Sequence, residues 1–297
     1  LVLGRIDAHG RFGSNLTLQA EAAREALARL GEQLGLDPRQ AAAGMVEVVE
    51  EVMAGALRRV SVEQGADPRR AALVAFGGAG GLHGTSLARR LDMAGMLVPL
   101  HAGVFSALGL LLSPPRQDWS HTVMTTKARE VDSQLGTFHQ MAEEQLRADG
   151  VEPVEVRSSV DVRYIGQSHE LTVDYTPGDG WDTLADRFHR LHAERNGFAR
   201  PDDLIEVVTV RVAALGSPVL TWQQLPDIRP GGDPERGTRS VVIGPSPVDA
   251  SVWWRPGLAP GAEVIGPAVI EEPEATTFLH PGERAVVHDS GALQVDW

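Results

Sequence analysis

Apolar residues recur at helical spacing through most of the first 112 residues. The helices predicted in this way cover residues 17–34, 82–91 and 103–112. A longer helix begins at Asp37, because aspartate is a preferred N-cap and Pro38 fits the first helical position. We expect this helix to run to Gly65, a residue that commonly stops helices.

Two short apolar runs between these helices, residues 71–76 and 95–100, predict strands, and the first has the composition of a buried strand. The opening LVLGRI, residues 1–6, is also apolar like a strand and has no polar lead-in. We therefore expect a further N-terminal part before it. Strand, glycine turn, helix and strand in this order are typical of α/β folds, which bind ligands at the carboxyl ends of strands.

Beyond residues 113–118, where two prolines interrupt the pattern, polar and apolar residues alternate. The alternating runs predict strands at 154–166, 169–177, 205–216, 262–272 and 284–289. Two helices are predicted in the same part of the chain, at 128–148 and 181–195. Residues 227–240 are rich in proline and glycine and are expected to form a surface loop. At about 150 residues per domain, we predict two domains, an α/β domain at 1–125 and a β-rich domain at 126–297.

Composition narrows the classes of function. The chain carries 27 Lys and Arg against 40 Asp and Glu, a net charge of −13 that repels phosphate backbones and anionic membranes. It has no cysteine, which excludes thiolate nucleophiles, disulfides and cysteine-based metal sites. It shows neither an apolar run of about 18 residues nor a signal-peptide pattern. We therefore expect a cytoplasmic protein that binds neither nucleic acid nor a membrane.

The segment AFGGAGGLHG, residues 75–84, places five glycines between a predicted strand and a predicted helix. It misses the dinucleotide fingerprint G-x-G-x-x-G because Gly84 comes one residue too late, and it misses the phosphate loop because no lysine precedes Thr85. Glycines still let a backbone approach a ligand closely, and the free amides of a helix N-terminus attract anions. A tight packing turn between strand and helix is the structural alternative.

Four histidines are candidates for polar contacts or metal binding. His83 follows the glycines at a helix start, where an imidazole could donate to a phosphate or substrate oxygen; the alternative is a contact with the backbone. His101 ends a predicted strand and is expected to pin its turn. His189 and His192 lie three residues apart on a predicted helix, but no third ligand is near, so a helix face is favoured over a metal site.

Acidic and hydroxyl side chains suggest no complete catalytic set. Asp161 and Arg163 alternate onto one strand face, where we expect an ion pair between them. Three glutamates could form a carboxylate pair or a Mg²⁺ site, although the solvated end of a strand explains them more simply. They are Glu271, Glu272 and Glu274. Ser86 and Ser106 lack the G-x-S-x-G elbow of serine hydrolases, so no catalytic residue is assigned.

Five sequence blocks carry a resemblance to a known family. In order from Leu73 to Leu293 they read LVAFGGAGGLHG, LVPLHAGVFSALGLLLSPPRQD, DVRYIGQSHELTV, GFARPDDLIEVVTVRVAALG and GAEVIGPAVIEEPEATTFLHPGERAVVHDSGAL. They resemble the C-terminal half of the hydantoinase A/5-oxoprolinase family, which also includes the β-type subunits of acetone and acetophenone carboxylases. The opening LVLGRID is similar to the family's mid-chain LVLGRL. The resemblance implies an α/β fold, with part of an actin/sugar-kinase-like (ribonuclease-H-like) ATPase lobe followed by a β-rich α+β C-terminal domain.

The resemblance also implies which residues contact a cofactor. Residues 75–84 are similar to a second-lobe loop of the family that faces the adenosine side of ATP. The residues implied to bind the nucleotide are Gly77, Gly78, Ala79, Gly80, Gly81 and His83. Gly81 and Gly84 stand where the family usually has proline and alanine, so a more flexible loop is expected.

The phosphate loop of the family, of the type D-x-G-G-T, would hold Mg²⁺ and the phosphates and does not occur in this sequence. The nearest candidate, GSNLT at residues 13–17, lacks the acid and the glycine pair. We therefore expect the Mg²⁺ ligands on an N-terminal lobe outside this chain and no metal site within it. The chain alone is not expected to complete ATP chemistry.

The function implied by the resemblance is that of the C-terminal portion of the ATP-using subunit of a hydantoinase or 5-oxoprolinase. ATP would phosphorylate the oxygen of a small cyclic amide, and water would attack the activated carbon with help from a hydantoinase B-type partner in an oligomer. Two alternatives stay open: the β-type subunit of an ATP-dependent ketone carboxylase, and a non-catalytic assembly module for a partner subunit. The missing serine elbow disfavours an unrelated α/β hydrolase.

Overall fold

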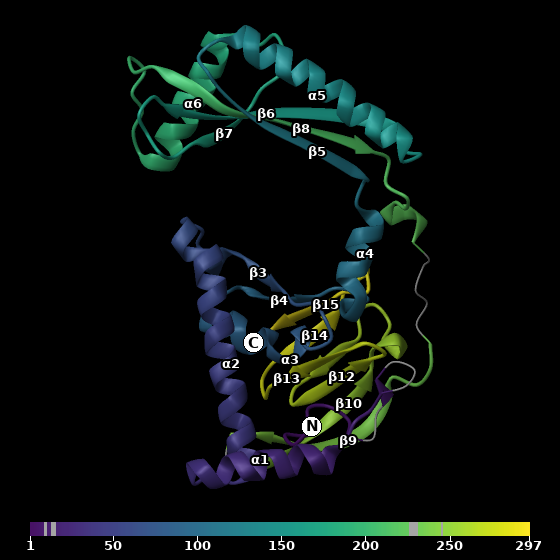
Figure 1. Ribbon diagram of the computed structural model, residues 1–297. Helices are drawn as coiled ribbons and strands as arrows, with labels where there is room; N and C mark the ends of the chain where they lie inside the picture. The colour runs from purple at the N-terminus through teal and green to yellow at the C-terminus, as the bar shows by residue number, and fades with distance from the viewer. Residues whose placement is uncertain (9–10, 13–15, 226–230, 245) are drawn as a thin grey trace. The chain divides into compact units, whose positions relative to one another are not determined.

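The computed structural model describes residues 1–8, 11–12, 16–225, 231–244 and 246–297. The chain forms two compact units (Figure 1): unit 1 consists of Leu1–Gly109 and Pro226–Trp297, and unit 2 of Leu110–Leu225. The units divide the chain differently from the domains expected at 1–125 and 126–297. The physical reason is that β15, near residue 295, pairs with β4, near residue 97, so the C-terminal region packs with the N-terminal one.

The elements follow one another in two groups. Unit 1 contains β1 (Arg11–Phe12), β2 (Leu16–Thr17), α1 (Ala20–Leu34), α2 (Pro38–Val60), β3 (Ala72–Val74), α3 (Gly80–Arg90), β4 (Gly95–Val98), the start of α4 (Phe105–Leu112), β9 (Glu235–Ile243), β10 (Ser246–Trp254), β11 (Glu263–Ile265), β12 (Ala268–Glu272), β13 (Ala275–Leu279), β14 (Arg284–Val287) and β15 (Leu293–Asp296). Unit 2 contains β5 (Arg116–Thr125), α5 (Ala128–Ala148), β6 (Pro153–Tyr164), β7 (Leu171–Asp174), α6 (Trp181–Asn196) and β8 (Ile205–Gly216).

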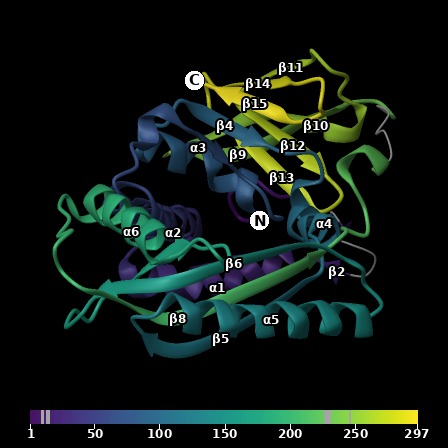
Figure 2. The ribbon, with the colours of Figure 1, turned by 90° about the horizontal axis from the view of Figure 1, so that it is seen from above.

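Unit 1 is built on two main sheets. The five-stranded sheet has the order β11-β14-β15-β4-β3, of which Figure 2 labels the first four strands, and β3 and β4 run parallel. The four-stranded sheet has the order β13-β12-β10-β9, in which β10 and β12 run parallel. One core cluster joins the two sheets and includes Met96 of β4, Val295 of β15, Ile270 of β12 and Leu279 of β13. The sheets therefore pack face to face around a shared hydrophobic core.

Helix α3 covers the other face of the four-stranded sheet. Leu82 of α3 packs with Val269 of β12 and Phe278 of β13. Helix α2 packs in turn on α3 through Ala54 and Leu87. The start of α3, which carries the glycine segment, is thus held between the sheet and α2.

Unit 2 has an antiparallel sheet of order β5-β8-β6-β7. Helices α5 and α6 share one core with this sheet, which includes Leu135, Phe188, Val160 and Val210 (Figure 1). Among the residues that the structure describes, no helix of either unit has the length and apolar character needed to cross a bilayer.

Several elements form as the local sequence predicts. Asp37 Oδ1 accepts the amides of Arg39 and Gln40 at 2.8 and 2.9 Å, and Gln40 Oε1 accepts the Asp37 amide at 2.9 Å. This capping box starts α2 as expected. Helix α5 and strand β8 have the predicted bounds, 128–148 and 205–216.

Other local expectations were wrong. Residues 1–6 form turns instead of a strand, and the Leu3 carbonyl accepts the Val242 amide at 2.9 Å. Strand β3 is not buried, because it forms the edge of its sheet and leaves Val74 exposed. Residues 235–240 of the expected surface loop belong to β9, while residues 227–230 lie outside the described part, as do residues 13–15 of GSNLT.

Candidate functional site

The glycine segment follows β3 and leads into α3, which begins at Gly80, two residues earlier than predicted. Gly77 donates its amide to the Ala102 carbonyl at 2.7 Å, and the Gly78 carbonyl accepts the Thr276 amide at 3.2 Å. Gly77 has φ +86°, a backbone conformation that glycine adopts without strain. No described heavy atom lies within 4 Å of the place where its Cβ would stand. The backbone at Gly77 therefore faces open space.

Two other glycines of the segment are needed for packing. A Cβ on Gly81 would lie 2.5 Å from Thr277 Oγ1 and 2.8 Å from the Thr276 carbonyl oxygen, both on β13. A Cβ on Gly84 would overlap Met96 Sδ on β4. The expectation that Gly81 and Gly84 make the loop more flexible was thus wrong: both are buried in α3 and let the helix approach the sheets closely.

His83 lies in the first turn of α3 and contacts α2. Its Nδ1 is 3.2 Å from Oε1 of Glu50, a side chain that is only 6% exposed, and Arg90 Nη2 lies 3.7 Å from the other carboxylate oxygen. Burial alone would raise the pKa of Glu50, but the hydrogen bond from His83 and the charges of His83, Arg5 and Arg90 outweigh burial and lower this pKa. An ionised carboxylate only accepts, so the His83 Nδ1 carries a proton. Its Nε2 has no hydrogen-bond partner among the described residues.

An apolar hollow of about 430 Å³ lies beside His83. It is open to solvent and is lined by residues of the N-terminal segment, α1, α2 and the start of α3, among them Ala79 of the glycine segment. Besides His83, the charged group on its wall is Arg5, whose guanidinium carbon lies 4.7 Å from the centre of the Phe278 ring. Arg5 Nε is buried and has no hydrogen-bond partner in the described part of the chain. Aliphatic walls with few polar groups are typical of sites for small organic ligands.

A second polar cluster on α3 escaped the sequence analysis because its members lie far apart in the chain. Ser86 Oγ is 3.4 Å from His280 Nε2, while the fully buried Glu283 accepts the His280 amide at 2.7 Å and pairs with Arg89 Nε at 3.1 Å. Burial, as the strongest influence, lowers the pKa of His280. Glu283 binds the backbone of His280 and not its ring, so Ser86 lacks the acid–histidine relay of a serine hydrolase.

The three glutamates considered for Mg²⁺ do not form a metal site. Glu271 binds Arg239 at 2.8 Å, and Glu272 binds Arg255 at 2.7 Å. Glu272 is 8% exposed, so the expectation of a solvated strand end was wrong for it, whereas Glu274 is exposed. Burial raises the pKa of Glu272, and Arg255 opposes this effect. No group of three potential metal ligands gathers anywhere in the described residues.

The other histidines have structural surroundings. His101 is exposed, has φ +57° and caps a short 3₁₀ turn after β4. His189 Nδ1 lies 2.8 Å from the Tyr164 hydroxyl, and His192 Nδ1 donates to the Phe198 carbonyl at 2.7 Å. Both imidazoles of α6 thus fix this helix in unit 2, as the helix-face interpretation predicts.

The expected ion pair between Asp161 and Arg163 is not formed. Asp161 binds Arg211 at 2.7 Å, and Arg163 binds Glu206 at 2.9 Å, with both partners on β8. Glu206 lies directly opposite Arg163, whereas Arg211 lies diagonally across from Asp161, within reach of a long side chain, so each charge takes a partner on β8.

Comparison with known protein families gives matches over nearly the whole chain. The sequence model described as Hydantoinase/oxoprolinase matches residues 1–119, and the one described as Hydantoinase/oxoprolinase C-terminal domain matches residues 118–294. The break between these two matches falls near the boundary predicted at residue 125, whereas the compact units do not follow it.

Three curated relatives align with almost all of this chain. An uncharacterized protein of Methanocaldococcus jannaschii is 36% identical over 100% of this chain and 43% of its own length. The caprolactamase subunit alpha of Pseudomonas jessenii is 28% identical over 99% of this chain and 45% of its own length. The acetone carboxylase beta subunit of Xanthobacter autotrophicus is 26% identical over 95% of this chain and 42% of its own length. The chain thus spans less than half the length of these relatives.

Two solved structures resemble the fold. The ATP-dependent caprolactamase of Pseudomonas jessenii aligns with a TM-score of 0.73 at 27% identity, and nucleotide-free acetone carboxylase aligns with a TM-score of 0.76 at 21% identity. Each alignment covers 99% of this chain and 45% of the other chain, and the second supports the fold alone. The family matches cover both units, and the mixed α/β architecture agrees with these structures. This chain therefore belongs to the hydantoinase/oxoprolinase family.

Proposed function

We propose that this chain forms part of the nucleotide site of an ATP-dependent cyclic-amide hydrolase, within the ATP-using subunit. The observation that carries the proposal is the apolar hollow lined by Ala79 and His83, at the end of a glycine segment that opens a helix. Its volume of about 430 Å³ suits a flat ring such as a purine. Helix-start amides next to it suit a polar or anionic edge of the same ligand.

Each residue of the proposed site has a distinct role. Gly77 allows close approach of the backbone to a ligand, Ala79 borders the ring, and Gly80 starts the helix. Gly78 packs closely on the chain, because a Cβ there would lie 3.1 Å from the Glu274 carbonyl oxygen. Gly81 lets α3 reach β13. His83 offers Nε2 as an acceptor for a ligand N–H, because Glu50 keeps the proton on Nδ1.

The described residues fit the base of a nucleotide better than its phosphates. The one lysine of the chain, Lys127, belongs to unit 2 and pairs with Glu130 at 2.8 Å. Glu271 and Glu272 are engaged by arginines, which leaves no acidic pair for Mg²⁺ there. The proposal therefore assigns Mg²⁺ and phosphate binding to a separate actin-like lobe. Bound ATP supplies the phosphoryl group that activates the amide oxygen of the substrate.

A substitution that fills the hollow tests this site. Ala79→Trp adds a large side chain at an exposed position and is expected to weaken ATP binding at least about tenfold, since purine and indole would compete for one space. Ala66→Trp makes the same change at an exposed position outside the hollow and should leave binding unchanged. Calorimetry with the full gene product measures both. Equal ATP affinity in the two variants would remove the hollow from the nucleotide site.

The substrate is tested by turnover. The proposal includes a small cyclic amide, a hydantoinase B-type partner subunit, an oligomeric enzyme and a cytoplasmic location. ATP hydrolysis by the full gene product with its partner subunit should depend on hydantoin, 5-oxoproline or a lactam.

The similarity to an acetone carboxylase beta subunit favours one second candidate, a ketone carboxylase. ATP turnover that depends on a ketone and bicarbonate, and on no cyclic amide, would select it. Partner binding without any nucleotide binding would select the assembly module.

A further inference from the structure

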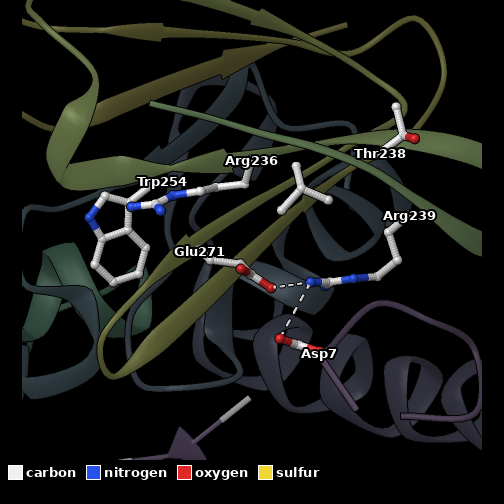
Figure 3. A pocket seen from close by; sticks show the side chains of 7 residues that line it. Asp7, Arg236, Thr238, Arg239, Trp254 and Glu271 are labelled. Carbon is white, nitrogen blue, oxygen red and sulfur yellow. Dashed lines mark ion pairs between the residues drawn. The ribbon is translucent and has the colours of Figure 1, made fainter. Parts of the chain in front are cut away.

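An irregularity in β9 turns Arg236 and Arg239 toward the same hollow. Residues three apart on a regular strand point to opposite faces of the sheet. Here the pairing of β9 with β10 shifts register opposite residues 251–253, and Gly237, inside the shift, has φ +94°. Both arginines consequently line one hollow (Figure 3). Bulges of this kind are a recurrent means of redirecting a side chain at a functional site.

The hollow has a volume of about 460 Å³ and lies on the four-stranded sheet of unit 1. Trp254 of β10 and Glu271 of β12 are paired in register and form part of its wall, and Thr238 of β9 lies near its rim (Figure 3). Asp7 reaches it from the N-terminal segment. This volume falls within the range of about 300–1,000 Å³ that is usual for small-molecule sites.

The two arginines of the hollow differ in their charge partners. Arg239 Nη2 lies 2.8 Å from Glu271 Oε1 and 4.0 Å from Asp7 Oδ2, so its position is fixed and its charge is balanced. The Arg236 guanidinium carbon lies 5.5 Å from the centre of the Trp254 ring. Among the described residues, Arg236 has no ion-pair partner. Stacking occupies the flat face of a guanidinium and leaves its N–H edge available for a planar or tetrahedral oxyanion.

We propose that this hollow binds a small oxyanion ligand, one that carries a carboxylate or phosphoryl group. Arg236 supplies a charge that has no ion-pair partner among the described residues, and the indole of Trp254 contacts an apolar part of the ligand. The hollow shares no lining residue with the one beside His83, so this proposal does not rest on the proposed nucleotide site.

Calorimetric titrations with inorganic phosphate and, separately, with succinate test the proposal and distinguish the two chemical groups. At least one of these ions should bind at a single site, with a Kd that rises about tenfold in Arg236→Gln, because a charge-assisted contact is lost. Arg69→Gln removes a comparably exposed arginine elsewhere in unit 1 and should leave the Kd unchanged.

Each outcome of the two titrations either supports or contradicts the proposed oxyanion site. Binding of both ions supports an oxyanion site, and binding of one alone assigns its group to the ligand. The proposal is overturned if neither ion binds below about 10 mM or if Arg236→Gln binds as tightly as the unaltered protein. Arg236 is exposed, so its substitution should preserve the fold, which circular dichroism of each variant verifies.

Discussion

Arg255 Nη1 lies 2.7 Å from Glu272 Oε1, and the two side chains are only 4% and 8% exposed. Arg255 Nη2 also donates to the carbonyls of Val98, Pro99 and Gly291 at 2.8, 2.9 and 3.1 Å. This one guanidinium therefore connects β12 of the four-stranded sheet to the end of β4 and to the turn before β15 in the five-stranded sheet.

Loss of this guanidinium should destabilise unit 1 strongly. Arg255→Met leaves Glu272 as a buried carboxylate without its partner, and such a loss typically costs about 3–5 kcal/mol of unfolding free energy. Urea denaturation measures the change. Arg284→Met, which removes a 47% exposed arginine from pairs with Glu263 and Asp296, should cost no more than about 1 kcal/mol. Equal effects of the two changes would mean that the buried pair contributes little.

A methyl group at Gly81 should also destabilise the protein. In Gly81→Ala the new Cβ meets backbone atoms of β13, which cannot give way as a flexible side chain can, so we expect a loss of about 1–3 kcal/mol. Gly44→Ala is the matched control, because it lies within α2 with no described heavy atom within 4 Å of the new Cβ. It should stabilise the protein by about 0.5–1 kcal/mol through helix propensity. Thermal unfolding of the pair shows whether the signs differ as expected.

Mild acid should weaken the fold through His280. Burial lowers the pKa of this imidazole below its ordinary value of 6.5, even though Glu283 opposes the shift. The unfolded chain then takes up the proton at a higher pH than the folded chain does. The stabilisation is present above pH 6.5 and is lost as the pH falls through the lower pKa of the folded state. His280→Gln should flatten the decline of unfolding free energy below pH 6.5. Urea denaturation at a series of pH values checks this, and an unchanged slope would contradict it.

The Tyr175 hydroxyl should lose its proton at a higher pH than an ordinary tyrosine does. Burial, and then the hydrogen bond that its hydroxyl donates to Asp132 at 2.9 Å, raise its pKa from 10.0 to about 12. The chain has two tyrosines, so Tyr164→Phe leaves Tyr175 as the one phenol whose absorbance reports ionisation. Its contribution to stability is complete below pH 10 and is lost as the pH rises through about 12. A midpoint near 10 in a chain that circular dichroism shows to be folded would disprove the shift.

Elements with strong local signals could be predicted from the sequence. Asp37 and Pro38 set the start of α2, and the alternation of residues 205–216 defined β8. Strand β9 was missed because Gly237 and the register shift interrupt its alternation, so that part of it resembles a loop. Strand β5 was missed because most of its side chains are polar, and it depends on pairing with β8 for its stability.

The candidate site was predictable only in part. The glycine segment was found from its composition, but β13 decides that Gly81 packs while Gly77 faces open space, and β13 lies far along the chain. The partner of His83 could not be inferred, because Glu50 lies 33 residues earlier on another helix. Contacts of this kind arise when elements far apart in the chain pack together, so no periodic pattern in the nearby sequence predicts them.

Strand β4 lies between β3 and β15 in the five-stranded sheet, although β15 is formed by residues 293–296. During synthesis, β4 leaves the ribosome long before this neighbour exists, while unit 2 is contiguous in sequence and is complete earlier. Throughout that interval one edge of β4 is unpaired and open to wrong partners. We therefore expect unit 1 to become protease-resistant after unit 2, although its first residues are synthesised earlier. Limited proteolysis of arrested nascent chains would reveal this order.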